Sequence, residues 1–398
     1  MEQKIYNEYV EILKEELLPA MGCTEPIAVA YAAAVAVQAL GEKPESVEVN
    51  VSANIIKNVK SVVVPCTGGL RGIGAAVCAG IVAGCPEKEL EILEEITGEQ
   101  KVEMKKMLDT MPMTIRESDK EYIFDIQIKA CAGGHSGYVE IAGFHTNVIC
   151  VKKDDEIIRE KAYEEQGSSC ATDRSLLTVE KIIEFADCVD VADVEEVLQR
   201  QIDYNWAIAE EGMTGKWGAA IGKTLMEAYG NSVHNRAKAM AAAGSDARMN
   251  GCELPVVINS GSGNQGMTTS LPVIVYAKEL NVSKEMMLRA LVVSNLITIH
   301  MKTGIGRLSA YCGAISAGCG AGAGICYLYG GRAYEISHVI VNAVAINSGV
   351  VCDGAKASCA AKIASAVEAG LLGLQMQKNG KQFYGGDGLV EKGVENTI

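Results

Sequence analysis

The sequence has few aromatic residues and an unfavourable charge for binding polyanions. Only 5% of its 398 residues are Phe, Trp or Tyr, and 50 acidic residues against 36 basic ones give a formal net charge of −14. A chain this acidic repels phosphate backbones, and no basic cluster is interleaved with aromatic residues. We therefore expect no nucleic-acid partner.

Long apolar runs are missing as well. No stretch contains about 18 uninterrupted apolar residues, the length that suggests a membrane-spanning helix. The first segment, MEQKIYNEYVEILKEELL, has the charged, amphipathic pattern of a helix and lacks the apolar centre of a signal peptide. We therefore predict a cytoplasmic protein without membrane contact, whose cysteines are free thiols or metal ligands.

Apolar residues make up 48% of the chain, which is enough for large cores, and the length predicts two domains. Alternating apolar and polar side chains predict strands in the first part of the chain, among helices such as 2–18 and 26–40. These predicted strands lie at 46–53, 62–64, 112–117, 122–130, 137–142 and 147–153.

After residue 175 the pattern becomes helical almost throughout. Helices are predicted at 214–229, 305–330 and 355–376, among others, and the polar stretch 164–176 is typical of a linker. We therefore expect an α+β protein. A mixed α/β domain at 1–170 carries the GCTEP motif, and a mostly helical domain at 175–398 holds the cofactor.

Cysteine is present in excess. Five of the 14 cysteines lie in the Gly- and Ala-rich stretch 311–364, namely Cys312, Cys319, Cys326, Cys352 and Cys359. Thiolates are the ligands of iron–sulfur clusters, so we predict that this stretch holds one. Cysteines buried in a tight helix bundle are one alternative. Zinc is another, although the paired C-x2-C units of zinc ribbons are absent.

Spacing limits which of these cysteines can bind together. Cys352 and Cys359 are seven residues apart, which on one continuous helix separates them by about 10 Å, too far for one cubane. We therefore predict Cys352 in a loop, Asp353 as a helix N-cap and Cys359 about one turn inside the helix. The same spacing allows only one of Cys312 and Cys319 to bind. A three-cysteine site would leave one iron open as a Lewis acid.

The GCTEP motif is the second candidate site. Pro26 suits a first helical turn, with Thr24 or Glu25 as cap, so Cys23 would stand at a helix N-terminus. The helix dipole there would lower the pKa of the Cys23 thiol. The motif therefore predicts an anion-friendly pocket with a thiol and a carboxylate side by side, and a simple helix cap is the alternative.

A polar loop, SGSGNQG at 260–266, precedes an apolar helix and is the third candidate. Backbone N–H groups at a helix start bind carboxylate or phosphate, whereas a flexible turn is the plainer interpretation. The Walker lysine and the GxGxxG pattern of nucleotide sites are absent. His145 and His300 are further candidates, and Lys302 and Lys356 could neutralise a carboxylate or a cluster. No pattern marks a pyridoxal phosphate lysine.

Four segments together resemble a known family: GCTEPIAVAYAAA, SGSGNQG, GRLSAYCG and VCDGAKASCAAKIA. They are similar to motifs of the iron–sulfur L-cysteine desulfidases, whose C-terminal half is similar to the α chain of iron–sulfur L-serine dehydratases. The resemblance extends from Cys23 to about Ala369. It implies a pyridoxal-independent β-elimination that converts L-cysteine to sulfide, ammonia and pyruvate, with the substrate thiolate on the open iron of a [4Fe–4S] cluster.

The resemblance also implies roles for individual residues. Cys312, Cys352 and Cys359 correspond to the cluster ligands, and CDGAKASC resembles the dehydratase CDP…PC element with a shorter spacing. AGCGAGAGIC resembles a dehydratase segment that would select Cys319 instead of Cys312, and we predict Cys312. GCTEP stands where the dehydratases have SSSHT, so the histidine of that segment is missing and Cys23 or Glu25 becomes the predicted base.

The substrate is expected to contact residues of both motifs. These are Thr24, Ser260, Ser262, Gly263, Asn264 and Gln265. The site is expected between the two domains, in a protein that we expect to be a homodimer. L-serine dehydration is the alternative activity, and a non-catalytic iron–sulfur sensor or a zinc hydrolase would be proteins of other classes.

Overall fold

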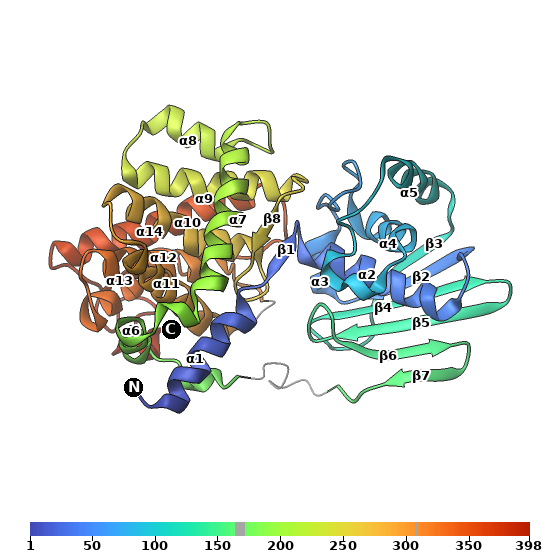
Figure 1. Cartoon of the computed structure of the whole chain (residues 1–398), viewed down its shortest axis with the longest axis horizontal. Coiled ribbons are helices and arrows are strands. Elements are labelled where there is room, and N and C mark those ends of the chain that lie inside the picture. Colours follow the sequence, from blue (N-terminus) through green and yellow to red (C-terminus); the bar gives the residue numbers. More distant parts are fainter. Residues whose placement is uncertain (164–171, 307–308) are drawn as a thin grey trace.

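The computed structural model describes residues 1–163, 172–306 and 309–398. Two lobes lie side by side, one built on a β-sheet and one built of helices (Figure 1). The predicted α+β class is confirmed. Within the described residues, no helix combines the length and the apolar character that crossing a bilayer requires.

The first lobe contains a six-stranded sheet in the order β3-β2-β4-β5-β6-β7. All neighbouring strands are antiparallel except β2 and β3, which are parallel. The strands are β2 (Ser46–Val51), β3 (Met113–Glu117), β4 (Asp125–Ala132), β5 (His135–Ala142), β6 (Val148–Lys153) and β7 (Glu156–Glu160).

Helices cover one face of this sheet (Figure 1). They are α2 (Thr24–Leu40), α3 (Ala53–Val59), α4 (Gly72–Ala83), α5 (Gly98–Thr110) and the 3-10 helix η1 (Pro86–Glu91). Val47, Val49 and Val51 alternate with more exposed residues and join the buried core of this lobe. A Cβ atom on Gly80 would lie 1.9 Å from the carbonyl oxygen of Ala30, so α2 and α4 pack backbone to backbone.

The second lobe is a layered helix bundle around α12 (Ala314–Leu328), which packs against α10, α11, α13 and α14. Small residues permit this central position, since a Cβ atom on Gly318 would lie 2.2 Å from the carbonyl oxygen of Ala366. The other elements are η2 (Arg174–Leu176), α6 (Val179–Cys188), η3 (Val191–Asp193), α7 (Glu195–Met213), α8 (Ile221–Tyr229), α9 (Val233–Met249), α10 (Gly263–Glu279), α11 (Lys284–Ile305), α13 (Ala333–Ile346), α14 (Cys359–Lys378) and α15 (Val394–Thr397).

The chain begins in the helical lobe. The apolar stripe of α1 (Gln3–Glu16) joins the helical core, where the ring of Tyr9 lies 5.2 Å from that of Phe185. Strand β1 (Pro19–Met21) then pairs antiparallel with β8 (Pro255–Val257). The sequence-based division assigned residues 1–170 to one domain, whereas the buried side chains of α1 pack with the helices.

Several predicted elements differ from the structure. The helix predicted at 305–330 is wrong in its first part, because residues 309–313 are not helical and α12 begins at Ala314. The helix predicted at 355–376 begins later, at Cys359, and that predicted at 214–229 is reduced to α8. Segment 62–64 forms only an isolated bridge. The predicted linker overlaps residues 164–171, which lie outside the described residues.

Strands β1, β7 and β8 were not predicted. All five residues of β7 are exposed, so the alternation that marks a half-buried strand is missing there. Strands β1 and β8 have three residues each, which is too short for a pattern to be recognised.

Candidate active site

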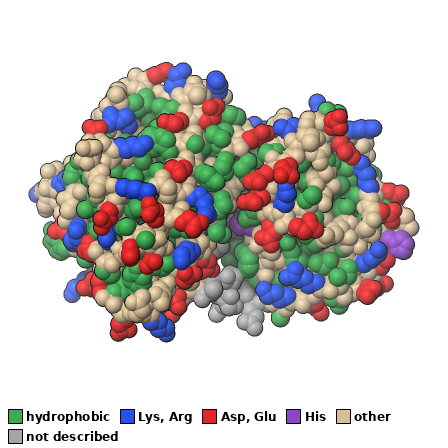
Figure 2. All heavy atoms as spheres, viewed as in Figure 1, with side chains coloured by type: hydrophobic (Ala, Val, Ile, Leu, Met, Phe, Trp, Pro, Cys, Tyr) green, Lys and Arg blue, Asp and Glu red, His purple; other side chains and the backbone are tan. Residues whose placement is uncertain are grey.

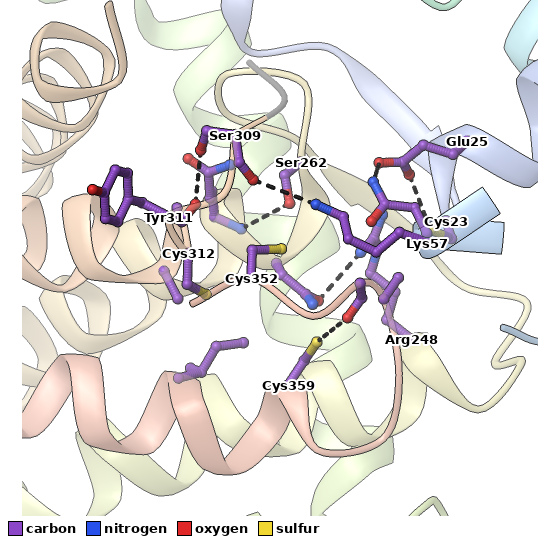
Figure 3. A pocket seen from close by; sticks show the side chains of 18 of the residues that line it. Cys23, Glu25, Lys57, Arg248, Ser262, Ser309, Tyr311, Cys312, Cys352 and Cys359 are labelled. Atoms are coloured by element: carbon purple, nitrogen blue, oxygen red, sulfur yellow. Dashed lines mark hydrogen bonds between the residues drawn. The ribbon is translucent and has the colours of Figure 1, made fainter. Parts of the chain in front are cut away.

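A pocket lies where the two lobes meet, at the place where the sequence put the site (Figure 3). Its volume is about 100 Å³. The sheet lobe contributes Cys23, Glu25, Lys57 and Asn58. Figure 2 shows the surface hollowed between the lobes on the face in view.

Most of the predicted site residues line this pocket. They are Cys23, Glu25, Ser262, Asn264, Gln265, Cys312, Cys352 and Cys359. The side chains of Thr24 and Ser260 are buried behind it: the Thr24 hydroxyl donates to the Gly261 carbonyl at 3.3 Å, and the Ser260 hydroxyl donates to Asn259 Oδ1 at 2.9 Å. Gly263 is also absent from the lining.

The three predicted cysteine ligands come from three separate segments of the helical lobe. Cys312 precedes α12, Cys352 lies in the loop before α14, and Cys359 is the first residue of α14. Two backbone hydrogen bonds join the loops: Cys312 N donates to Val350 O at 3.1 Å, and Cys352 N donates to Ala310 O at 2.7 Å. The loop position of Cys352 agrees with the spacing argument.

The local helix start differs from the prediction. Ser358, not Asp353, holds the N-cap position of α14, and Cys359 therefore lies at the helix start instead of one turn inside it. The carboxylate of Asp353 pairs with Lys362, and with Lys356 at 3.4 Å. Lys356 lies three residues beyond Asp353 in the same loop, whereas Lys362 lies in the first turn of α14.

The donor set has the chemistry of an iron–sulfur site, because thiolates are the ligands of such clusters. Among the described residues, no three His, Cys, Asp or Glu side chains converge closely enough to hold a single metal ion. Three half-buried thiols line one pocket together with Gly313, Ala314 and Gly354, small residues that leave room for a bulky group.

Cys319 does not belong to this pocket. It lies inside α12, is 1% exposed and does not line the pocket, and burial raises the pKa of its thiol to about 12. Cys326, which lies about two turns further along the same helix, is likewise buried, and burial raises the pKa of its thiol to about 12. Of the two cysteines between which the sequence left a choice, Cys312 lines the pocket and Cys319 does not.

Cys23 holds the N-cap position of α2, and its thiol donates to Glu25 Oε2 at 3.1 Å. Burial, with the negative charge of Glu25, raises the pKa of Cys23 well above the usual value for a thiol. The predicted lowering of this pKa by the helix dipole is therefore wrong. The dipole effect is smaller than the cost of placing a thiolate in a fully buried position beside a carboxylate.

Glu25 is the charged partner of this pair. Burial alone would raise the pKa of Glu25, but the positive charge of His145, the hydrogen bond from Cys23 and the charge of Arg248 outweigh it and lower the pKa. Asn58 Nδ2 also donates to Glu25 Oε1 at 3.0 Å. At neutral pH the pair is therefore a protonated thiol hydrogen-bonded to a carboxylate.

His145, in the turn between β5 and β6, does not line the pocket, but its charge acts on Glu25. Its ring lies 5.0 Å from that of Phe124, and a Cβ atom on Gly261 would lie 3.7 Å from its Cε1. The sequence marked His145 only as one of two histidine candidates. The other, His300, pairs with Glu395 Oε2 at 2.7 Å and does not line the pocket.

Three cations of the pocket belong to none of the predicted motifs. Arg248, at the end of α9, is 4% exposed, and its Nη1 donates to Asn264 Oδ1 at 3.2 Å. Burial lowers the pKa of Lys302, a residue of α11, to about 8. Lys57, from α3, donates to the carbonyl of Ser309 at 3.4 Å. Sequence had suggested Lys302 only because of its nearness to the cysteine stretch.

The predicted polar loop does lead into a helix. Ser262 holds the N-cap position of α10, and its hydroxyl accepts from Gln265 N at 3.5 Å. The Gln265 side chain lies against Gly313, where a Cβ atom would be 2.6 Å from its Cδ. Glycine at 313 thus lets the loop residue stand directly beside Cys312.

Comparison with known proteins gives relatives over the whole chain. Residues 87–398 match the family model described as serine dehydratase alpha chain. A UPF0597 protein of Desulfitobacterium hafniense is 58% identical over 397 residues, covering 100% of this chain and 92% of the relative. UPF0597 proteins of Lachnoclostridium phytofermentans and Treponema denticola are 50% and 44% identical, covering 99% and 100% of this chain and 94% of each relative.

Proposed function

The chain belongs to the serine dehydratase alpha chain family, and on that basis we propose that it is an iron–sulfur lyase that eliminates sulfide from L-cysteine. One observation carries the proposal. Three cysteines and a thiol–carboxylate pair, from different lobes, line the same pocket. Such a pocket combines a metal-binding side with a proton-accepting side, which a β-elimination requires.

Cys312, Cys352 and Cys359 are the proposed ligands of a [4Fe–4S] cluster. When bound, the cluster supplies a Lewis-acidic iron that stabilises the sulfide as it leaves. Lys302 is buried, and its ammonium interacts with Cys312 and Cys352. Its positive charge therefore lies where it offsets the negative charge of the thiolates.

Cys23 and Glu25 are proposed to remove the Cα proton together. Cys23 takes this proton while its own thiol proton passes along the 3.1 Å hydrogen bond to Glu25. The electron pair of the broken Cα–H bond forms the Cα–Cβ double bond, and the Cβ–S bond breaks with its electrons on sulfur. The resulting aminoacrylate hydrolyses to pyruvate and ammonia.

The loop before α10 is proposed to hold the substrate. Ser262, Asn264 and Gln265 line the pocket at the first turn of α10, where backbone N–H groups and the helix dipole favour a carboxylate. Thr24 supports this loop from the sheet lobe through its hydrogen bond to Gly261. Ser260 and Gly263 are proposed to shape the loop, since neither lines the pocket.

Dehydration of L-serine is the second candidate, favoured by the description of the matching family model. The same proton transfer would then expel hydroxide in place of sulfide. The position of the residues is equally suited to both leaving groups, so the preference is decided by comparing kcat/KM for the two amino acids on one preparation.

Anaerobically purified protein should contain about four irons per chain, as one [4Fe–4S] cluster requires. It should release sulfide and pyruvate in equal amounts from L-cysteine, with a higher kcat/KM than for L-serine. A higher value for L-serine would make the protein a dehydratase. Iron-containing protein that acts on neither amino acid, or an iron-free anaerobic preparation, would contradict the proposal.

A further inference from the structure

We propose that Arg248 binds the α-carboxylate of the substrate and so restricts the pocket to α-amino acids with a free carboxylate. The inference rests on the proposed function, because it assigns the substrate class of the same site. Arg248 belongs to none of the motifs recognised in the sequence, and it enters the pocket from the last turn of α9.

The first argument is a buried cation whose hydrogen-bond donors are incompletely used. Arg248 is 4% exposed, yet its guanidinium forms no ion pair with any carboxylate of the described residues, and the amide oxygen of Asn264 is its hydrogen-bond acceptor. Its Nε is buried without a partner. A buried guanidinium with free donors is costly unless an anion completes it, and a carboxylate accepts two parallel N–H bonds.

The second argument is position. In an α-amino acid the carboxylate is bonded to the carbon that loses its proton, so its receptor must stand beside the base. Arg248 lines the same pocket as Cys23, Glu25 and Cys359, so its side chain shares one cavity with the proton-accepting pair and with the cysteine side. Figure 3 shows Arg248 directed into the pocket beside Cys23.

The third argument is the space that the loop leaves for this side chain. A Cβ atom on Gly263 would lie 2.5 Å from Arg248 Nε and 2.8 Å from its Cζ. Only glycine at 263 therefore lets the guanidinium lie against the first turn of α10. The arginine and the helix N-terminus, both of which favour anions, are thus brought to one place.

The other two cations of the pocket have different surroundings. Lys302 lies on the cysteine side, where it interacts with Cys312 and Cys352. Lys57 donates to the carbonyl of Ser309. Arg248 is therefore the cation placed to meet a carboxylate next to Cys23 and Glu25.

Binding measurements on anaerobic, iron-loaded protein test the inference. L-cysteine and L-cysteinamide, which lacks the carboxylate, are titrated calorimetrically into wild type, Arg248→Gln and Arg248→Lys, each carrying Cys23→Ala so that L-cysteine is not consumed. Arg236→Gln is the matched control, because Arg236 lies on the same helix and pairs with Glu279 outside this pocket. Pyruvate and sulfide release are recorded separately on the same proteins with Cys23 retained.

We expect wild type to bind L-cysteine at least about tenfold more tightly than the amide, as loss of a charge-assisted pair implies. Arg248→Gln should lose about 10- to 100-fold in affinity for L-cysteine and less than about threefold for the amide. Arg248→Lys should keep part of the preference, and Arg236→Gln all of it. Iron content should stay at the wild-type level in all variants.

Equal losses of acid and amide binding in Arg248→Gln would overturn the inference. If Arg248→Gln loses iron, Arg248→Lys is compared with wild type instead. A full wild-type preference for the acid in Arg248→Lys, or tighter binding of the amide than of the acid by wild type, would overturn the inference. If the preference for L-cysteine over the amide depends on Arg248 but neither L-cysteine nor L-serine is turned over, the proposed function alone is contradicted. If L-cysteine is turned over but the preference does not depend on Arg248, this inference alone is contradicted.

Discussion

At the scale of single residues, the proton positions of the Cys23–Glu25 pair decide what each group can do. The thiol is protonated and donates to a carboxylate that two further side chains, Asn58 and Thr24, also hydrogen-bond. Neither group is a strong base in isolation. In the proposed mechanism, proton removal therefore requires both, with Cys23 facing the substrate and Glu25 accepting the thiol proton.

Replacing either member of the pair should abolish turnover without loss of the cofactor. Cys23→Ala and Glu25→Gln should each lower kcat by about 100-fold or more, the usual contribution of a positioned general base. Iron content should be unchanged. Cys78→Ala, a buried cysteine of α4 outside the pocket, is the control. Loss of iron in Cys23→Ala would instead make Cys23 a cluster ligand.

The choice between Cys312 and Cys319 can be tested by iron analysis. Cys312→Ala should lower the iron content of anaerobically purified protein and remove activity, because its thiol lines the pocket. Cys319→Ala should keep its iron, since that thiol is enclosed within the helix packing around α12. Iron loss from Cys319→Ala with a normal melting temperature would reverse the assignment.

Residues that form local motifs could be singled out with a role from the sequence, whereas isolated residues could be given no specific role. Cys352 and Cys359 were recognisable from their spacing, and Cys23 from its place before Pro26. Arg248 and His145 are single residues that only the folded chain brings beside Glu25. The direction of the Cys23 pKa shift was missed because burial, which sequence alone does not give, dominates it.

At the scale of elements, strongly periodic helices were predicted well and the loops of the site were not. Residues 305–330 were predicted as one helix although glycine is a poor helix former, because no Pro or polar turn cluster marks where the helix begins. The structure keeps Tyr311 out of α12 because it forms a bridge with Val351, 40 positions further along the chain. Long-range pairing of this kind overrides local propensity and places Cys312 next to Cys352.

The stabilisation that the contact between α9 and α14 gives the folded state should depend on pH, because this contact includes the carboxylate of Glu368. Hydrogen bonds and charge from His234 (2.9 Å) and Lys238 (2.6 Å) lower the pKa of Glu368 to about 2. Because the pKa of Glu368 is lower in the folded state than its ordinary value of 4.5, its charge stabilises the folded state at pH values above 4.5. This stabilisation is lost as the pH falls towards about 2.

Glu368→Gln should therefore lower the free energy of unfolding by about 1 kcal/mol at pH 7, a modest value because the side chain is partly exposed. Urea titrations at pH 7 and pH 3 would measure the difference between wild type and variant. The difference should narrow at the lower pH. A difference that is the same at both pH values would mean that the charge of Glu368 is not its cause.

At the scale of the whole molecule, Gly22 connects the two lobes. It follows β1, which pairs with β8 of the helical lobe, and precedes α2 of the sheet lobe. Its φ angle is +57°, and a Cβ atom there would lie 2.2 Å from Pro65 Cγ. The position of Cys23 relative to the three cysteines across the pocket therefore depends on this residue.

Gly22→Ala should lower kcat by about tenfold, because a small displacement of a proton-accepting group is costly, while iron content stays unchanged. Gly41→Ala, at the other end of α2 with a φ angle of +86°, is a control with comparable backbone strain. It should lose stability but not kcat. Equal losses of kcat in the two variants would argue against a special role for Gly22.

The expected homodimer stays a prediction that sedimentation velocity would check.

The placement of α1 in the helical core has a consequence for synthesis of the chain. Helix α1 ends at Glu16, but α6, which supplies its packing partner Phe185, begins at Val179. The entire sheet lobe is translated between them. We therefore expect the sheet lobe to fold first on the ribosome. During that time the apolar stripe of α1 is exposed, because the helices that cover it have not been synthesised, and it can be bound by chaperones.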